Sequence, residues 1–80
     1  MTIPYFDLHR GHDVKIGRFS YSGKSYDSVI HENDDGSIVY ITSIEGTIFI
    51  PKIAHSIENA VSKSNRWLRD IIGVPCQLDW

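Results

Sequence analysis

The sequence predicts an α+β fold: an antiparallel four-stranded β-meander followed by one long C-terminal helix. Residues 14–50 divide into short runs rich in β-branched and aromatic residues, and turn-forming Gly, Asn and Asp residues separate these runs. After Pro51 the apolar residues recur at the spacing of one helix face. A chain of 80 residues has room for a single core, so both patterns are assigned to one domain over residues 14–72.

Four segments are expected to form the sheet, at residues 14–22, 25–32, 37–44 and 47–50. In the first segment the apolar residues change face at Gly17–Arg18, which predicts a bulge or a sharp bend. The strongest turn is Asn33-Asp34-Asp35-Gly36, because these residues accept left-handed backbone angles. The third segment, SIVYITSI, is the clearest strand because β-branched residues dominate it.

The segment from about residue 52 to 72 is expected to be the helix. Pro51 suits its first turn, where the missing N–H would have no partner, and Gly73 with Pro75 marks its end. The apolar stripe consists of Ile53, Ile57, Ala60, Val61, Trp67 or Leu68, Ile71 and Ile72. The polar face opposite consists of Ser56, Asn59, Lys63, Arg66 and Asp70.

The length of this helix predicts a homodimer. At ~1.5 Å per residue it would be roughly 30 Å long, which is more than one small sheet covers. A domain of this size without disulfides or an evident metal site also commonly gains stability by oligomerising. The expected dimer interface is the part of the stripe formed by Ile53, Ile57, Val61, Leu68 and Ile72.

The two ends of the chain flank the domain. Residues 1–13 are expected to form an arm or, at Tyr5–Leu8, an extra edge strand. Residues 73–80 are expected to lack regular structure but to be pinned by Leu78 or Trp80, since both side chain types favour burial.

Composition excludes several classes of protein. No apolar run approaches the ~20 residues of a membrane helix, and the N-terminus has no apolar secretory core. The single cysteine, Cys76, can form no internal disulfide, so an intracellular protein is expected. The net charge of −2 counts against a dedicated polyanion binder, although residues 10–24 are locally basic and residues 27–45 locally acidic.

No motif indicates an enzyme, and no cofactor or metal site is expected. His9-x-x-His12-Asp13 offers two imidazoles and a carboxylate, but an exposed loop is the favoured interpretation because a metal needs three or four convergent ligands. Residues 31–37 lack the spacing of a calcium loop. Cys76 has no basic neighbour, and the serines lack a nucleophile motif.

Cations and aromatic residues alternate near the first two strands, at Arg10, Lys15, Arg18, Phe19, Tyr21, Lys24 and Tyr26. Single-stranded nucleic acid requires this combination, because cations track phosphates and rings stack on bases. We therefore expect a single-strand-binding face without marked sequence preference. The alternative is that Phe19 and Tyr26 belong to the core and that the cations are ordinary solvent-facing residues.

A family resemblance accompanies these residues. Residues 15–38 followed by 45–61 resemble the single-stranded-DNA-binding domain of the positive-cofactor-four family of transcriptional coactivators. The resemblance covers about residues 14–68 and is carried by the turn at 21–26, Asp34-Asp35-Gly36 and the stretch from Gly46 to Pro51. It implies a dimer formed through the helix and the sheets, unpaired DNA bound in the sheet grooves, and a role in transcription regulation.

A second class of function stays open. A small protein-interaction or inhibitor domain, such as a phage-type accessory protein, would present a sheet edge or the acidic hairpin of residues 27–45 to a protein partner. Salt separates the two hypotheses, because binding through phosphates weakens steeply as salt rises and apolar docking does not.

Overall fold

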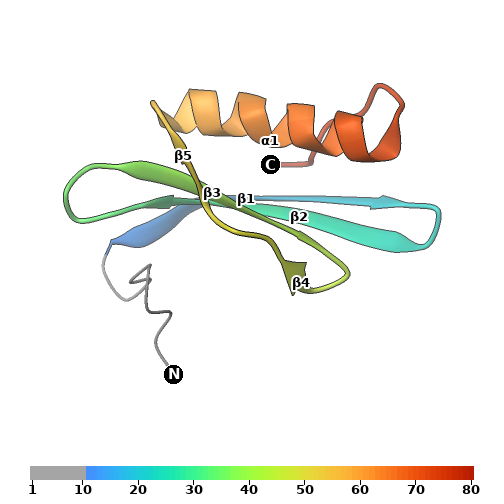
Figure 1. Cartoon of the computed structure of the whole chain (residues 1–80), viewed down its shortest axis with the longest axis horizontal. Coiled ribbons are helices and arrows are strands. Elements are labelled where there is room, and N and C mark those ends of the chain that lie inside the picture. Colours follow the sequence, from blue (N-terminus) through green and yellow to red (C-terminus); the bar gives the residue numbers. More distant parts are fainter. Residues whose placement is uncertain (1–10) are drawn as a thin grey trace.

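In the computed structural model, which describes residues 11–80, one helix lies across one face of an antiparallel sheet (Figure 1). The elements are β1 (His12–Tyr21), β2 (Lys24–Glu32), β3 (Ile38–Ile44), β4 (Thr47–Ile48), β5 (Lys52–Ala54) and α1 (Ile57–Ile72). The predicted α+β class is confirmed: the strands follow the order β1-β2-β3-β4, and the helix comes last. The strand predicted at Tyr5–Leu8 lies outside the described residues.

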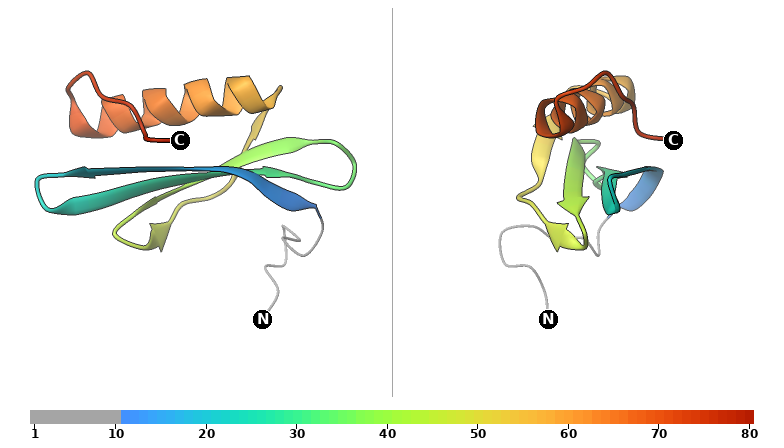
Figure 2. Two further views of the ribbon diagram at one scale, coloured as in Figure 1. Left: turned by 180° about the vertical axis from the view of Figure 1, so that it is seen from behind. Right: turned by 90° about the vertical axis from the view of Figure 1, so that its right-hand side faces the viewer.

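The sheet and the helix form two layers, and the C-terminal segment turns back from the end of α1 toward β1 (Figure 2). β5 is an element that the sequence did not predict, and it pairs with β3 beside β4. No helix within residues 11–80 combines the length and the apolar character needed to span a membrane.

The helix begins at Ile57, so the predicted start at residue 52 is wrong. Ser56 has extended backbone, and its hydroxyl accepts a hydrogen bond from the N–H of Asn59 at 3.0 Å, which makes it the N-cap. Residues 52–54 instead pair with β3. Pro51 therefore precedes an edge strand, a position that also tolerates a residue without an N–H.

The irregularity in β1 lies at Val14, so the bulge predicted at Gly17–Arg18 is wrong. The register of β1 against β2 shifts between Asp13 and Lys15, which leaves Val14 as the extra residue. Gly17 is required for a different reason, because a Cβ at this position would lie 2.7 Å from the indole ring of Trp80.

Two clusters of buried side chains fill the space between α1 and the sheet. The first contains Ile30, Ile38, Tyr40, Ala54 and Ala60. The second contains Tyr26, Leu68 and Leu78. The hydroxyls of Ser28 and Ser64, both fully buried, share a hydrogen bond of 2.7 Å between the sheet and the helix. Both layers are thus tied together along the length of α1.

The C-terminal segment contains neither a helix nor a named strand, and Leu78 and Trp80 hold it against the core. The Oδ1 atom of Asn65 accepts hydrogen bonds from the N–H of Leu78 at 3.0 Å and from the indole N–H of Trp80 at 3.3 Å. Arg18 and Asp79 exchange two backbone hydrogen bonds, of 3.1 and 2.8 Å. The segment therefore covers part of the outer edge of β1.

Candidate nucleic-acid interface

The residues expected to bind nucleic acid do not form one surface. Arg10 lies outside the described residues. In an antiparallel pair, residues directly opposite each other share a sheet face. Because Tyr26 belongs to the core cluster under α1, this rule assigns one group to the helix-facing side: Lys15, Phe19, Tyr21, Lys24 and Tyr26. Arg18 pairs with Asp27 on the opposite face.

Two of the three aromatic residues of this group, Tyr26 and Phe19, pack in or against the core. Tyr26 is 6% exposed, so stacking on a base would require it to leave its contacts with Leu68 and Leu78. Phe19 is half-buried against the same cluster, and its ring stacks on Tyr21 with a centroid distance of 6.4 Å. Tyr21, at 44% exposure, is the ring of this group that remains most open to a ligand.

The cations of this group are also separated. Trp80 covers Gly17, which lies in β1 between Lys15 and Tyr21. On the other face of the sheet, the Nε of Arg18 lies 3.9 Å from a carboxylate oxygen of Asp27. The structure therefore divides the predicted patch into three small surfaces: one at Lys15, one at Tyr21 and Lys24, and one at Arg18 on the other face. For the aromatic rings, the alternative in which Phe19 and Tyr26 are core residues agrees better with the structure.

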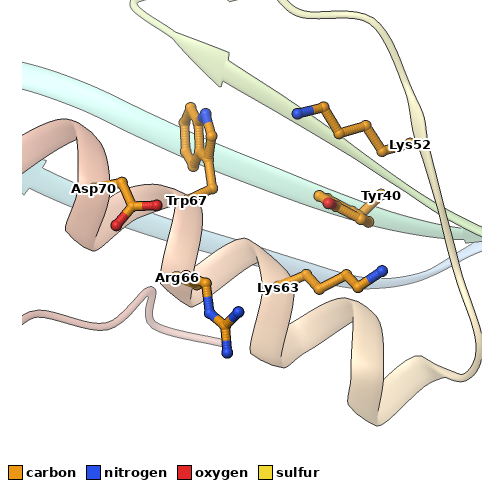
Figure 3. Close-up of a pocket in the computed structure, with 6 residues that line it drawn as sticks. All are labelled: Tyr40, Lys52, Lys63, Arg66, Trp67 and Asp70. Atoms are coloured by element: carbon orange, nitrogen blue, oxygen red, sulfur yellow. The ribbon is translucent and has the colours of Figure 1, made fainter.

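Another set of cations and rings does come together, in an open hollow of about 290 Å³ between α1, β3 and β5 (Figure 3). Its lining consists of Tyr40, Lys52, Lys63, Arg66, Trp67 and Asp70. We call it the α1–β3–β5 hollow. The four helical members follow the spacing i, i+3, i+4 and i+7, so they share one helix face. Lys52 and Tyr40 are cross-strand partners in β5 and β3.

The indole of Trp67 forms a wall of this hollow, and Phe49 holds it in place. The two rings meet edge to face, with centroids 5.9 Å apart and an interplanar angle of 86°. Phe49 lies in the connection between β4 and β5, where its N–H donates to the carbonyl of Thr42 at 2.9 Å. Figure 3 shows Lys52 reaching from β5 toward this indole.

Three cations and one carboxylate give the hollow a local positive charge. Within residues 11–80, Lys52, Lys63 and Arg66 take part in no ion pair. Asp70 also makes none, although it lies on the same helix face. Cations without a carboxylate partner in a concave site favour an anionic ligand.

The helical part of this site could have been found in the sequence. Lys63, Arg66 and Asp70 were assigned to the polar face of the helix, whereas Trp67 was considered, as an alternative to Leu68, for the apolar stripe. The contribution of Lys52 was missed because residues 52–54 were expected to form the first turn of the helix. Only the pairing of β5 with β3 brings Lys52 opposite Tyr40.

The residues of the expected dimer interface are mostly covered by their own chain. Leu68 is fully buried, and Ile57, Val61 and Ile72 are half-buried against the two core clusters. Ile53 is 75% exposed, but it belongs to β5 rather than to the helix. Dimerisation through this stripe stays a prediction.

The remaining candidate groups have structural partners. Nδ1 of His31, which is 2% exposed, lies 2.8 Å from Oδ1 of Asp13. In the acidic turn, hydrogen bonds from the hydroxyl and the N–H of Ser37 lower the pKa of Asp35 below its ordinary value. Within residues 11–80, no group of three His, Cys, Asp or Glu side chains is placed to hold a metal ion.

Comparisons with protein-family models, with curated proteins and with solved structures find no match for this chain. Its function is therefore inferred from the chemistry of the α1–β3–β5 hollow and of the exposed surface around it.

Proposed function

We propose that the protein binds single-stranded nucleic acid and that the α1–β3–β5 hollow holds the strand. The observation that carries this proposal is the convergence of three cations, none of them ion-paired within residues 11–80, around the Trp67 indole, with the buried ring of Tyr40 at the base of the hollow. The cations come from β5 and α1, Trp67 comes from α1, and Tyr40 comes from β3. The resemblance to the positive-cofactor-four family supports the same class of ligand, although here the hollow rather than the sheet face gathers the cations and rings.

Each group in the hollow has a separate task in this function. Lys52, Lys63 and Arg66 neutralise backbone phosphates and release their counterions, which supplies most of the sequence-independent affinity. Trp67 offers an indole on which a base stacks, an interaction worth ~1–3 kcal/mol. The base must be unpaired to lie against the indole, so the site favours single strands over duplexes. A local site of this kind also explains how a chain with a net charge of −2 would bind a polyanion.

The test is a titration of a fluorescently labelled oligothymidine of twelve nucleotides, followed by anisotropy at several salt concentrations. We expect binding that weakens as salt rises. Making the Lys52→Gln and Lys63→Gln substitutions together should weaken binding strongly and reduce the slope of log affinity against log salt by roughly 1.4, because each phosphate contact on a single strand contributes ~0.7.

The matched control makes the same charge change outside the hollow, with Lys15→Gln and Lys24→Gln on the β1–β2 hairpin. Both side chains are exposed. This variant should keep most of the affinity and of the salt slope. If the hairpin pair rather than the hollow pair abolished binding, the strand would bind the face expected from the sequence. Absence of binding by the unmodified protein at low salt would contradict the function itself.

A second candidate function is docking of a protein partner along β4 and β5. Ile48, Ile50 and Ile53 are 70%, 73% and 75% exposed, which is unusual for isoleucine. Within residues 11–80, β4 and β5 pair only with β3, so their outer edges are open. An extended apolar segment of a partner could add here as a further strand. Such binding would change little with salt and would survive the change of Lys52 and Lys63.

A further inference from the structure

The α1–β3–β5 hollow contains one carboxylate among its cations, and the position of this group is informative. The side chain of Asp70 is exposed, and it makes no hydrogen bond or ion pair within residues 11–80. Figure 3 shows its carboxylate on the side of Trp67 that faces away from Lys52 and Tyr40. A free carboxylate in a site for a polyanion needs an explanation, since it repels every phosphate that approaches.

The lining groups follow a fixed order along the helix. Lys63 comes first, Arg66 and Trp67 follow about one turn later, and Asp70 follows after nearly another turn. Asp70 stands seven positions after Lys63, which at ~1.5 Å per residue is a separation of roughly 10 Å along the helix axis. A nucleotide has a comparable reach from its phosphate, through its sugar, to the outer edge of its base.

This order orients a bound nucleotide. The phosphate is attracted to Lys52, Lys63 and Arg66, of which the two on the helix precede Trp67, and it is repelled from Asp70, which follows Trp67. A base that stacks on Trp67 therefore directs its outer, hydrogen-bonding edge toward the carboxylate. An ionised carboxylate only accepts hydrogen bonds, and its two oxygens accept two parallel N–H donors best.

The four bases differ in what they present to such an acceptor. Guanine offers two adjacent donors on its Watson–Crick edge, the ring N1–H and the 2-amino group. Adenine and cytosine each offer one amino group beside a ring nitrogen that accepts. Thymine and uracil offer one N–H between two carbonyl oxygens, which a carboxylate repels. Unpaired bases are commonly recognised through this edge.

We infer that Asp70 is a specificity-determining residue that makes the hollow prefer guanine among unpaired bases. The inference rests on the proposed function, because it assigns a base to the site that holds the strand. It differs from the expectation of a site without marked sequence preference, because Asp70 would recognise the base of one nucleotide in the bound strand. Discrimination by a bidentate contact to a base edge is typically about 5- to 150-fold.

The test uses nucleoside 5′-monophosphates to displace the labelled oligothymidine, because each supplies one phosphate and one base. We expect guanosine monophosphate to compete at least about fivefold better than thymidine monophosphate, the lower end of such discrimination. Inosine monophosphate, which lacks the 2-amino donor, should fall between them. In the Asp70→Asn variant, the ratio of guanosine to thymidine monophosphate should fall close to one. The affinity for oligothymidine itself should rise, because the carboxylate that repels phosphates and thymine carbonyl oxygens has been removed.

The control variant is Glu58→Gln, which makes the same change of charge on α1 outside the hollow. It should preserve the ratio between the two nucleotides. If oligothymidine binds but guanosine monophosphate competes no better than thymidine monophosphate, or if Asp70→Asn leaves their ratio unchanged, the role of Asp70 is wrong and the proposed function stands. If the unmodified protein does not bind oligothymidine at all, both fall together.

Discussion

At the scale of single residues, Gly17 shows how one missing side chain organises the C-terminal segment. The strand position itself does not need glycine, because the bulge in β1 lies at Val14. The requirement comes from Trp80, whose ring occupies the space that a Cβ at Gly17 would enter. Trp80 in turn donates its indole N–H to Asn65, so a glycine in β1 permits a contact between the tail and α1.

We expect Gly17→Ala to destabilise the protein by about 1–3 kcal/mol, the usual cost of overpacking, because the new Cβ forces the indole to move. Thermal unfolding followed by circular dichroism measures this cost. The same substitution made in a Trp80→Ala background should cost much less, since the obstructing ring is absent. An equal loss of stability in both backgrounds would show that the backbone, not Trp80, requires glycine at this position.

At the scale of elements, the start of α1 depends on a cap rather than on the apolar stripe. Ile53 and Ile57 stand four residues apart, as they would in one helix, yet Ile53 lies in a strand. Ser56 separates the two elements, because its hydroxyl satisfies the N–H of Asn59. The side-chain oxygen of Asn59 accepts a hydrogen bond from the N–H of His55 in return. This reciprocal arrangement ends the strand segment and begins the helix.

Ser56→Ala should lower the free energy of unfolding by roughly 1 kcal/mol, the typical cost of removing an N-cap. For a domain of this size, that loss corresponds to a fall in Tm of about 4–8 °C. The control is Ser62→Ala, an exposed position inside α1, where alanine should be neutral or slightly stabilising. If α1 instead began at residue 52, Ser56 would be an interior residue and its replacement by alanine would also raise stability.

At the scale of the whole molecule, the structure changes the basis for expecting a homodimer. The helix runs from Ile57 to Ile72, 16 residues, and is therefore shorter than the segment expected from residue 52. Its buried residues lie against the sheet of the same chain. Of the expected interface, Ile53 is the member that remains widely exposed, next to Ile50 and Ile48. Exposed apolar surface of this kind commonly marks a site of interaction with another protein chain.

The predicted homodimer can be tested by sedimentation equilibrium at micromolar concentration. We expect the mass of two chains, and we expect Ile53→Asp to reduce it to one chain while the circular dichroism spectrum stays unchanged. Val61→Asp should instead unfold the chain, because Val61 packs against the first core cluster. A monomeric mass for the unmodified protein would contradict the dimer, and unfolding by Ile53→Asp would contradict the exposed position of this residue.

Features that depend on neighbours along the chain could be predicted from the amino-acid sequence. The run of β-branched residues in 38–44 and the Asn-Asp-Asp-Gly turn before it specify local conformation, so β1 to β4 and their order were predictable, whereas β5 was not. Gly73, with a φ of 84°, ends α1 where its left-handed conformation was expected. Local propensity acts over a few residues, which is why these features need no knowledge of distant contacts.

Which distant residues meet depends on how the whole chain folds. Pro51 is compatible with a helix start and with an edge strand, and the pairing of β5 with β3 selected the second. The same pairing placed Lys52 beside Trp67 in the α1–β3–β5 hollow, while packing against Leu68 removed Tyr26 from the predicted binding face. Burial and cross-strand register depend on the whole chain at once, so spacing along the sequence could identify cations and rings but not which of them share a site.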